Sequence, residues 1–297
     1  PLKELPEQPL TFDINDENLE IFIHFQNGKY NFIGQKGDTY PQQKPLNDNA
    51  ISISMDAQML LNGISRSLFA TADDELRPVM NGVYFDIHTD DLTFVASDGH
   101  KLVRLRNLAV KSPERASFIL PKKPANLLKN LLAKESEQVL IKFDDNNAYI
   151  TCTNFEMVCR LIEGRYPNYN SVIPQENPFK VTIDRISFLN ALKRVSVFSN
   201  PASSLVKLHL KDSLITVSAQ DIDFSTSAEE RIVCQFDGTE LSIGFKATYL
   251  IEILGNISSE EVVLELADPS RAGLIVPSEN DEDEDLLMLL MPMMLND

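Results

Sequence analysis

The sequence predicts an α+β protein made of three copies of one unit, in which helices accompany antiparallel strands. A strand that leads into an amphipathic helix occurs twice, with matching residues at matching positions. A pattern of strand, acidic turn and strand occurs three times. The alternating stretches are not separated by a helix after nearly every strand, as a parallel sheet would require, so we expect antiparallel pairing.

The element that opens each complete copy is a short strand followed by a helix. The stretch ISMDAQMLLNGISRSLF aligns with VTIDRISFLNALKRVSV, so that Asp56 matches Asp184 and Arg66 matches Arg194. In the first of these stretches, apolar residues recur at the spacing of one helix face: Leu60, Leu61, Ile64 and Leu68.

The element that closes each copy is a hairpin. LTFDINDENLEIFI, VLIKFDDNNAYITC and VVLELADPSRAGLIV each place a turn between two alternating strands. Between the opening helix and the hairpin, the second and third copies carry further strands and a second helix, PANLLKNLLAKES and ATYLIEILGNI. Each complete copy is therefore expected to hold two helices and many antiparallel strands.

Two short segments rich in Pro, Asn and charge, QKPLNDNA and IPQENP, separate the copies. They predict domains at residues 1–48, 49–176 and 177–297. The first domain contains only the closing part of a copy, so either its front is absent from the sequence shown or it is a half copy. The missing initiator Met favours an absent front.

The composition excludes several classes of protein. A formal net charge of −17 argues against coating nucleic acid or anionic lipid by bulk attraction, which requires a basic surface. Three cysteines without a CxxC pair suit a reducing compartment, and there is no signal peptide, so we expect a cytoplasmic protein.

The chain closes on the apolar stretch LLMLLMPMML, which is too short to cross a bilayer and is interrupted by Pro292. Exposing a Leu or Met side chain forfeits roughly 1.5–3 kcal/mol relative to burying it. We therefore expect LLMLL to be the last strand. The remainder, MPMML, lies beyond the strand because Pro292 ends ladder pairing.

Four separated motifs carry a resemblance to a known family: RPVMNGVYFDI, FVASDGHKLVR, EGRYPNYNSVIP and the closing MPMML. In these motifs and in their order, the chain resembles the bacterial sliding clamps, the beta subunits of DNA polymerase III. The resemblance runs from Leu2 to Leu295.

The resemblance implies a ring. Family members carry three copies of the DNA clamp fold per chain, and two chains join head to tail, with helices lining the hole and sheets forming the outer wall. The ring encircles double-stranded DNA regardless of sequence, tethers the replicative polymerase and confers processivity. Because such a ring holds DNA by topology, a thin basic lining is enough and an acidic exterior does no harm.

The implied partners are duplex DNA, the polymerase III catalytic subunit, the clamp loader, and other polymerases and repair proteins that dock through short peptide motifs. The implied assembly is a homodimer without membrane contact. Basic residues at the helix positions would face DNA, although a solvated helix face remains the alternative for each and Glu252 weakens the pattern. These residues are Arg66, Lys122, Lys123, Lys129, Lys193 and Arg194.

In the family, the terminal segment lies over a hydrophobic peptide-binding groove. The matching residues here are Arg77, Val79, Met80, Ser97, Gly99, His100, Lys101, Leu102, Pro167, Val172, Tyr249, Leu289, Met291, Pro292, Met293 and Leu295. Met and Leu side chains would give an adaptable floor for several partners. Two alternatives stay open: SDGH is only a strand-ending turn, and Met293 and Leu295 are ordinary core. Val79 and Met294 depart from the family pattern, and Asn296 and Asp297 extend past its usual terminal leucine; these departures leave peptide preference open.

The ring seam is a further surface that the resemblance implies. Tyr30 and Phe32 on the strand KYNFIG would face Val197 and Phe198 of the partner chain. Apolar side chains on an edge strand suit pairing with another chain. The alternative is that Phe32 and Phe198 belong to the internal core.

No catalytic or metal-binding motif stands out, so we expect no enzyme, cofactor or metal. The four histidines are scattered, and the acid run of residues 279–285 lacks the Gly and the spaced Glu of a calcium loop, which makes it a solvated hairpin turn. Two rival classes remain: a hydrolase using Ser97, Asp98 and His100, which lie too close in sequence for a typical triad, and a repeat-built scaffold without a role on DNA.

Overall fold

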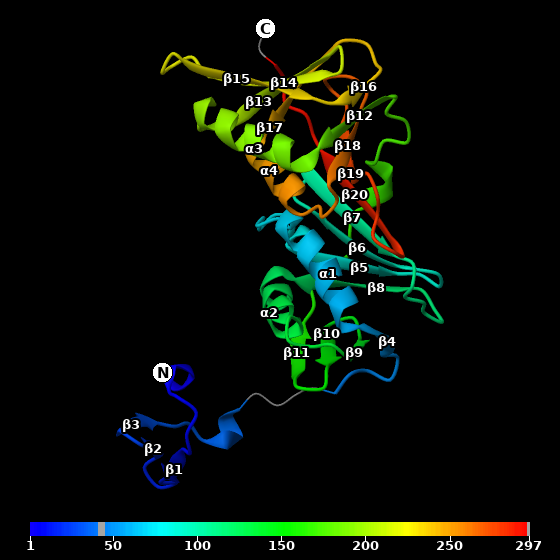
Figure 1. The fold of residues 1–297 in the computed structure, drawn as a ribbon. Helices are drawn as coiled ribbons and strands as arrows, with labels where there is room; N and C mark the ends of the chain where they lie inside the picture. Colours follow the sequence, from blue (N-terminus) through cyan, green and yellow to red (C-terminus); the bar gives the residue numbers. More distant parts are fainter. Residues whose placement is uncertain (41–44, 296–297) are drawn as a thin grey trace. The chain divides into compact units, whose positions relative to one another are not determined.

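The computed structural model describes residues 1–40 and 45–295, which form two compact units, Pro1–Pro45 and Leu46–Asp297 (Figure 1). We call them the small unit and the large unit. The terminal extension Asn296 and Asp297 lies outside the residues that the structure describes. Among the described residues, no helix has the length and apolar character needed to cross a membrane.

The small unit is a three-stranded antiparallel meander. Its strands are β1 (Thr11–Ile14), β2 (Glu20–Phe25) and β3 (Gly28–Ile33), flanked by the short 3-10 helices η1 (Leu2–Glu4) and η2 (Gly37–Thr39). Ile23 is its buried apolar residue among those described, so most of this sheet is exposed. The hairpin predicted from the first repeat is confirmed as β1 and β2.

The first half of the large unit contains two helices among its strands. In order they are β4 (Ile51–Asp56), α1 (Ala57–Ser67), η3 (Leu68–Ala70), η4 (Pro78–Met80), β5 (Gly82–Ile87), β6 (Leu92–Ser97), β7 (Lys101–Asn107), β8 (Ala116–Pro121), α2 (Lys122–Leu132), β9 (Gln138–Phe143), β10 (Asn147–Thr151), β11 (Glu156–Arg160) and η5 (Tyr169–Ser171).

The second half repeats this order. Its elements are β12 (Phe179–Asp184), α3 (Arg185–Val195), η6 (Ser196–Phe198), β13 (Leu205–Lys211), β14 (Leu214–Asp221), β15 (Thr226–Val233), β16 (Gln235–Phe236), β17 (Leu241–Lys246), α4 (Ala247–Gly255), β18 (Glu261–Leu266), β19 (Gly273–Pro277) and β20 (Glu284–Leu290).

The repeat is confirmed at the opening helices. Both begin directly after a strand whose last residue is an aspartate that caps the helix, as aspartate is suited to do. Asp56 accepts a hydrogen bond from the Gln58 amide at 2.8 Å, and Asp184 accepts one from the Ser187 amide at 2.7 Å. The helices α1 and α2 pack together, as do α3 and α4, and they lie along one side of the large unit (Figure 1).

The two halves share one antiparallel sheet. Its strand order is β16-β12-β18-β19-β20-β7-β6-β5-β8, so the last strand of the chain joins the strands of the second half to those of the first (Figure 1). Two four-stranded sheets, β11-β10-β9-β4 and β15-β14-β13-β17, complete the large unit. The predicted α+β fold with antiparallel sheets is confirmed.

Position in this sheet explains the apolar end of the chain. β20 is hydrogen-bonded to β19 on one side and to β7 on the other, and Leu286–Leu290 are buried on both faces. A strand covered on both faces and paired along both edges favours an uninterrupted apolar run. LLMLL is therefore the final strand, as predicted.

The three thiols are free: Cys159 is buried in β11, Cys234 is buried between β15 and β16, and Cys152 is half-buried directly after β10. Burial raises the pKa of Cys159 to about 11 and likewise raises the pKa of Cys152 to about 11, so neither is a reactive thiolate at neutral pH.

Candidate functional site

The segment after β20, residues 291–295, bridges the two halves of the large unit. The Met291 amide donates to the His100 carbonyl at 2.8 Å, and the Met293 amide donates to the Gly244 carbonyl at 2.8 Å. A Cβ at Gly244 would lie 2.7 Å from the Met293 oxygen, so only glycine allows this approach. Met291 is exposed and Met293 is half-buried. The segment thus continues past Pro292 by a single bridge rather than a ladder.

The motif SDGH forms a tight turn between β6 and β7. The Asp98 carboxylate accepts hydrogen bonds from the amides of His100 and Lys101, at 2.8 and 2.9 Å, and Gly99 adopts a φ of +92°. The turn interpretation is therefore correct for the backbone. The same geometry leaves His100 exposed beside the ring of Tyr249 on α4, with ring centroids 6.2 Å apart.

The hydrolase alternative is wrong in its geometry. The Ser97 hydroxyl donates to the Lys101 carbonyl at 2.8 Å and accepts from the Gly99 amide, and the side chain is buried. Asp98 binds backbone amides rather than the His100 ring. No nucleophile–base pair is formed by these three residues.

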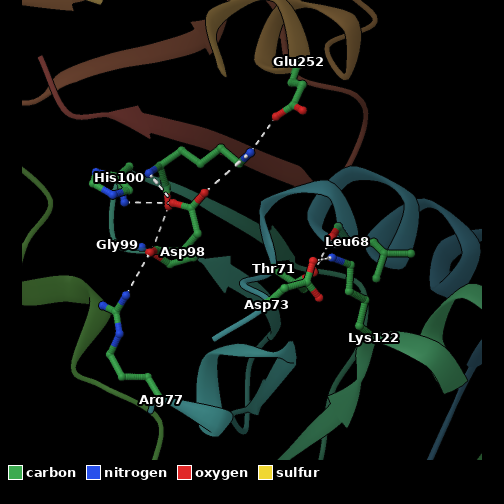
Figure 2. Close-up of polar contacts among 11 residues, drawn as sticks. Leu68, Thr71, Asp73, Arg77, Asp98, Gly99, His100, Lys122 and Glu252 are labelled. Carbon is green, nitrogen blue, oxygen red and sulfur yellow. Dashed lines mark hydrogen bonds and ion pairs between the residues drawn. The ribbon is translucent and has the colours of Figure 1, made fainter. Parts of the chain in front are cut away.

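Lys101 is a buried cation between the two halves. It is only 5% exposed, and its Nζ lies 2.5 Å from Glu252, 3.6 Å from Asp98 and 4.3 Å from the centroid of the Tyr249 ring. Figure 2 shows the Asp98 turn with contacts running to Glu252 on α4 and to Arg77 on the opposite side. Lys101 therefore supports the surface from beneath instead of lining it.

The residues predicted for the groove divide into a supporting layer and a surface layer. Buried members are Met80, Ser97, Lys101, Leu102 and Leu289. Exposed or half-buried members are Arg77, Val79, Gly99, His100, Pro167, Val172, Tyr249, Met291, Pro292, Met293 and Leu295. The expectation that the first group contacts a ligand directly does not fit its burial.

Arg77 and Val79 connect the surface layer to its surroundings. The Arg77 Nε donates to Asp74 at 2.8 Å, and its guanidinium reaches the Asp98 carbonyl at 3.4 Å. The segment of residues 161–172, which follows β11 and includes η5, is called the linker here. Val79 meets it at Gly164, whose φ is +123° and where a Cβ would lie 2.9 Å from the Val79 side chain. The structure thus brings RPVMNG, SDGH, the linker and the end of the chain to one region.

The predicted DNA-facing cations occupy the helices, but half of them are paired with acids. Lys122 contacts Asp73 at 2.5 Å, and Arg194 forms a two-pronged bond to Glu230, which raises the pKa of the arginine. The other predicted cations on α2 and α3 are Lys123 and Lys193, which are exposed, and Lys129, which is half-buried.

Arg66 departs most from its expected role. Its side chain is 13% exposed and its guanidinium contacts Asp281, Ser258 and Glu284, the last at 3.3 Å. The acid run expected to be a solvated turn does form the β19–β20 hairpin turn, but it also binds this arginine. The position of Arg66 in the repeat correctly predicted that it lies on a helix. It could not predict the acidic partners of Arg66, which are far away in the sequence.

The predicted seam residues are exposed. Phe32 is 48% exposed, Val197 78% and Phe198 41%, while Tyr30 is half-buried. The alternative that Phe32 and Phe198 are core residues is therefore wrong. Sequence reasoning missed β15, which is an edge strand next to η6 and ends on the exposed apolar residue Val233. Its only signal was the alternation in TSAEERIV, which the charges obscure.

No cluster of three or more His, Cys, Asp or Glu side chains suited to a metal occurs within residues 1–40 and 45–295.

Two protein-family models together match most of the large unit. The model of the DNA polymerase III beta subunit central domain matches residues 54–168, and that of its C-terminal domain matches residues 170–294. The chain is 27% identical over 294 residues to the beta sliding clamp of Pseudomonas aeruginosa, covering 99% of this chain and 78% of that one. It is 27% identical over 290 residues to the beta sliding clamp of Staphylococcus aureus, covering 97% and 76%.

Solved structures of sliding clamps are also similar to this chain over nearly its whole length. A sliding clamp from Pseudomonas aeruginosa bound to griselimycin matches with a TM-score of 0.91 at 26% identity, over 99% of this chain and 78% of that one. The DNA polymerase III beta subunit of Thermotoga maritima matches with a TM-score of 0.91 at 24% identity, over 99% and 78%, which supports the fold.

Proposed function

The chain belongs to the DNA polymerase III beta subunit family, the sliding clamps, and we propose from this premise that two copies close into a ring around duplex DNA. It acts as a noncatalytic processivity factor that tethers the polymerase. The main support for the ring is the pairing of β20 with β7, because it joins consecutive copies of the repeat edge to edge.

The repeat extends this pairing to a second chain. β20 is the last strand of the meander β18-β19-β20 that closes the last copy, and β3 is the last strand of the equivalent meander β1-β2-β3 in the small unit. β7 is the edge strand of the neighbouring strands β7-β6-β5-β8, and β15 is the edge strand of the equivalent set β15-β14-β13-β17 in the last copy. Among the described residues, β3 and β15 each keep one edge without a neighbouring strand. We place the seam there, with Phe32 facing Val197 and Phe198 of the partner.

The ring divides into three domains per chain, at residues 1–48, 49–176 and 177–297. Its hole is lined by α1, α2, α3 and α4. The exposed Lys123 and Lys193 contact phosphates there and Lys129 adds positive charge near them, whereas Lys122 and Arg194 are largely neutralised by Asp73 and Glu230. Few contacts keep the affinity low enough for sliding, since each phosphate contact adds to affinity and to its salt dependence.

The peptide-docking groove is formed by the surface layer around His100, Tyr249 and the segment 291–295. The apolar side chains of Met291, Met293 and Leu295 suit an adaptable floor, and His100 and Arg77 can bind polar ends of a peptide. That a similar clamp has been solved bound to griselimycin supports a surface able to take a ligand. The reduced thiols support a cytoplasmic location.

Sedimentation of the full-length protein tests the seam. A Val197→Asp substitution places a charge where an apolar contact is proposed and is expected to shift the dimer towards monomer. The matched control is Leu127→Asp, because Leu127 is also exposed, at 53%, but lies on α2. A monomeric wild type, or equal behaviour of the two variants, would contradict the seam.

A further inference from the structure

One face of the nine-stranded sheet carries a row of polar side chains that neither the ring nor the groove uses. The strand registers place Asp86 on β5, Thr93 on β6, Arg106 on β7 and Asp285 on β20 next to one another. Directly opposed residues in neighbouring strands lie on the same face. The linker covers part of this face, since the Tyr169 hydroxyl donates to Asp86 at 2.8 Å.

A hollow of about 290 Å³ opens beside this row, at the turn between β5 and β6. The turn contributes His88, β7 contributes Arg104 and Arg106, and Arg115 stands just before β8. Tyr169 of the linker forms another wall. The hollow therefore gathers basic side chains from three separate stretches of the chain.

The basic side chains of this hollow differ in how far they are already paired. Asp285 lies 2.8 Å from Arg104 and 3.6 Å from Arg106, and Asp86 lies 3.3 Å from the Nε2 of His88. Asp91 accepts from Arg106 at 2.9 Å and from Thr93 at 2.9 Å. Burial acts to raise the pKa of Asp91, but these two hydrogen bonds together with nearby charge, chiefly that of Arg106, hold the pKa below its usual range. Asp91 is thus an ionised support for Arg106.

Two arginines of the hollow keep donors available. Arg104 binds Asp285 through its Nη2 at 2.8 Å, but its Nε is buried and has no hydrogen-bond partner among the described residues. Arg115 is exposed and has no ion pair within the described part of the chain. A buried donor without a partner costs free energy, so a ligand that accepts from it is favoured.

We propose that this hollow binds a small phosphate compound. Guanidinium groups match phosphate oxygens in geometry and charge. A tetrahedral phosphate presents oxygens in several directions and can accept from arginines on different strands, whereas one carboxylate accepts in a single plane. The volume lies at the small end of the range for ligand pockets, about 300–1,000 Å³, which suits phosphate or pyrophosphate rather than a polymer. The proposal does not depend on ring closure or on the groove.

Calorimetric titration of the full-length protein tests this site, in a buffer of low ionic strength without phosphate. Pyrophosphate and inorganic phosphate are expected to bind saturably at one site per chain, and acetate to bind more weakly. Arg115→Ala and His88→Ala are expected to weaken pyrophosphate binding by about tenfold or more, equivalent to losing one charge-assisted contact. Both side chains are at least partly exposed, so the variants should keep the melting temperature of the wild type.

The matched control is Arg160→Ala, which removes the same charge from an exposed position on β11, where Arg160 pairs with Glu163. It is expected to leave the affinity unchanged. Absence of saturable binding at millimolar pyrophosphate would overturn the proposal. So would an equal loss of affinity in the Arg160 and Arg115 variants, which indicates general attraction, or acetate binding as tight as phosphate, which indicates a carboxylate site.

Discussion

Removing Arg66 should destabilise the large unit, because this arginine neutralises a buried carboxylate in the other half. Glu284 has a side chain that is 7% exposed, and its charge is compensated by Arg66 at 3.3 Å and by the Asn62 amide at 2.6 Å. Breaking one side of a buried pair costs about 3–5 kcal/mol, because the remaining charge is left without compensation.

The expected magnitude for Arg66→Ala lies at the lower end of that range, about 3 kcal/mol, since the Asn62 amide continues to donate to Glu284. The contact of Arg66 with Asp281 adds little, because Asp281 is 53% exposed and water screens it. For a unit of this size, each kcal/mol shifts the melting temperature by about 2–4 °C, so a decrease of about 6–12 °C is expected.

Urea and thermal unfolding of three variants measure this effect. Arg160→Ala, which breaks an exposed pair, should cost less than about 1 kcal/mol. The double variant Arg66→Ala with Glu284→Gln should recover most of the lost stability, because no buried charge remains. A cost for Arg66→Ala no larger than that of Arg160→Ala, or no recovery in the double variant, would refute the reasoning.

Two further predictions concern pH and close packing. Burial raises the pKa of Glu284 above its reference of 4.5, so the folded state holds a proton that the unfolded state has released. Stability should therefore fall as pH rises above that value; Glu284→Gln should lack this loss, which unfolding at several pH values measures. Gly244→Ala would place a Cβ 2.7 Å from the Met293 oxygen and should cost about 1–3 kcal/mol, with faster hydrogen exchange at the Met293 amide. Gly255→Ala is the control because nothing lies within 4 Å of its Cβ, and equal exchange in both variants would contradict the bridge.

Local features of the fold could be predicted because their causes are local. Asp56 and Asp184 cap helices through hydrogen bonds to amides two or three residues ahead, so the sequence next to each helix start contains the signal. The hairpins likewise show alternation and turn residues within a short span. The apolar run LLMLL indicated burial, although not that β20 would join two halves of the molecule.

Features that depend on distant partners could not be predicted. From its motif alone, Lys101 would be interpreted as a surface cation. Its burial is explained by the ion pair with Glu252 on α4, which is distant in the sequence. Arg66 reads as a member of a basic helix face, and its partners follow it by about two hundred residues in the chain. The edge strand β15 was missed because adjacent charges on a solvated strand resemble a loop. For Lys101 and Arg66 the deciding interaction is long-range, which a periodic pattern does not encode.

The central claim is that the chain acts as a closed ring on DNA. Its most direct test is retention of the full-length protein on nicked circular DNA, after incubation with clamp loader and ATP, before and after the circle is linearised. The account predicts that the protein stays on the circle and is lost once the DNA is cut, because topology rather than affinity holds it. Equal retention on circular and linear DNA would contradict the ring.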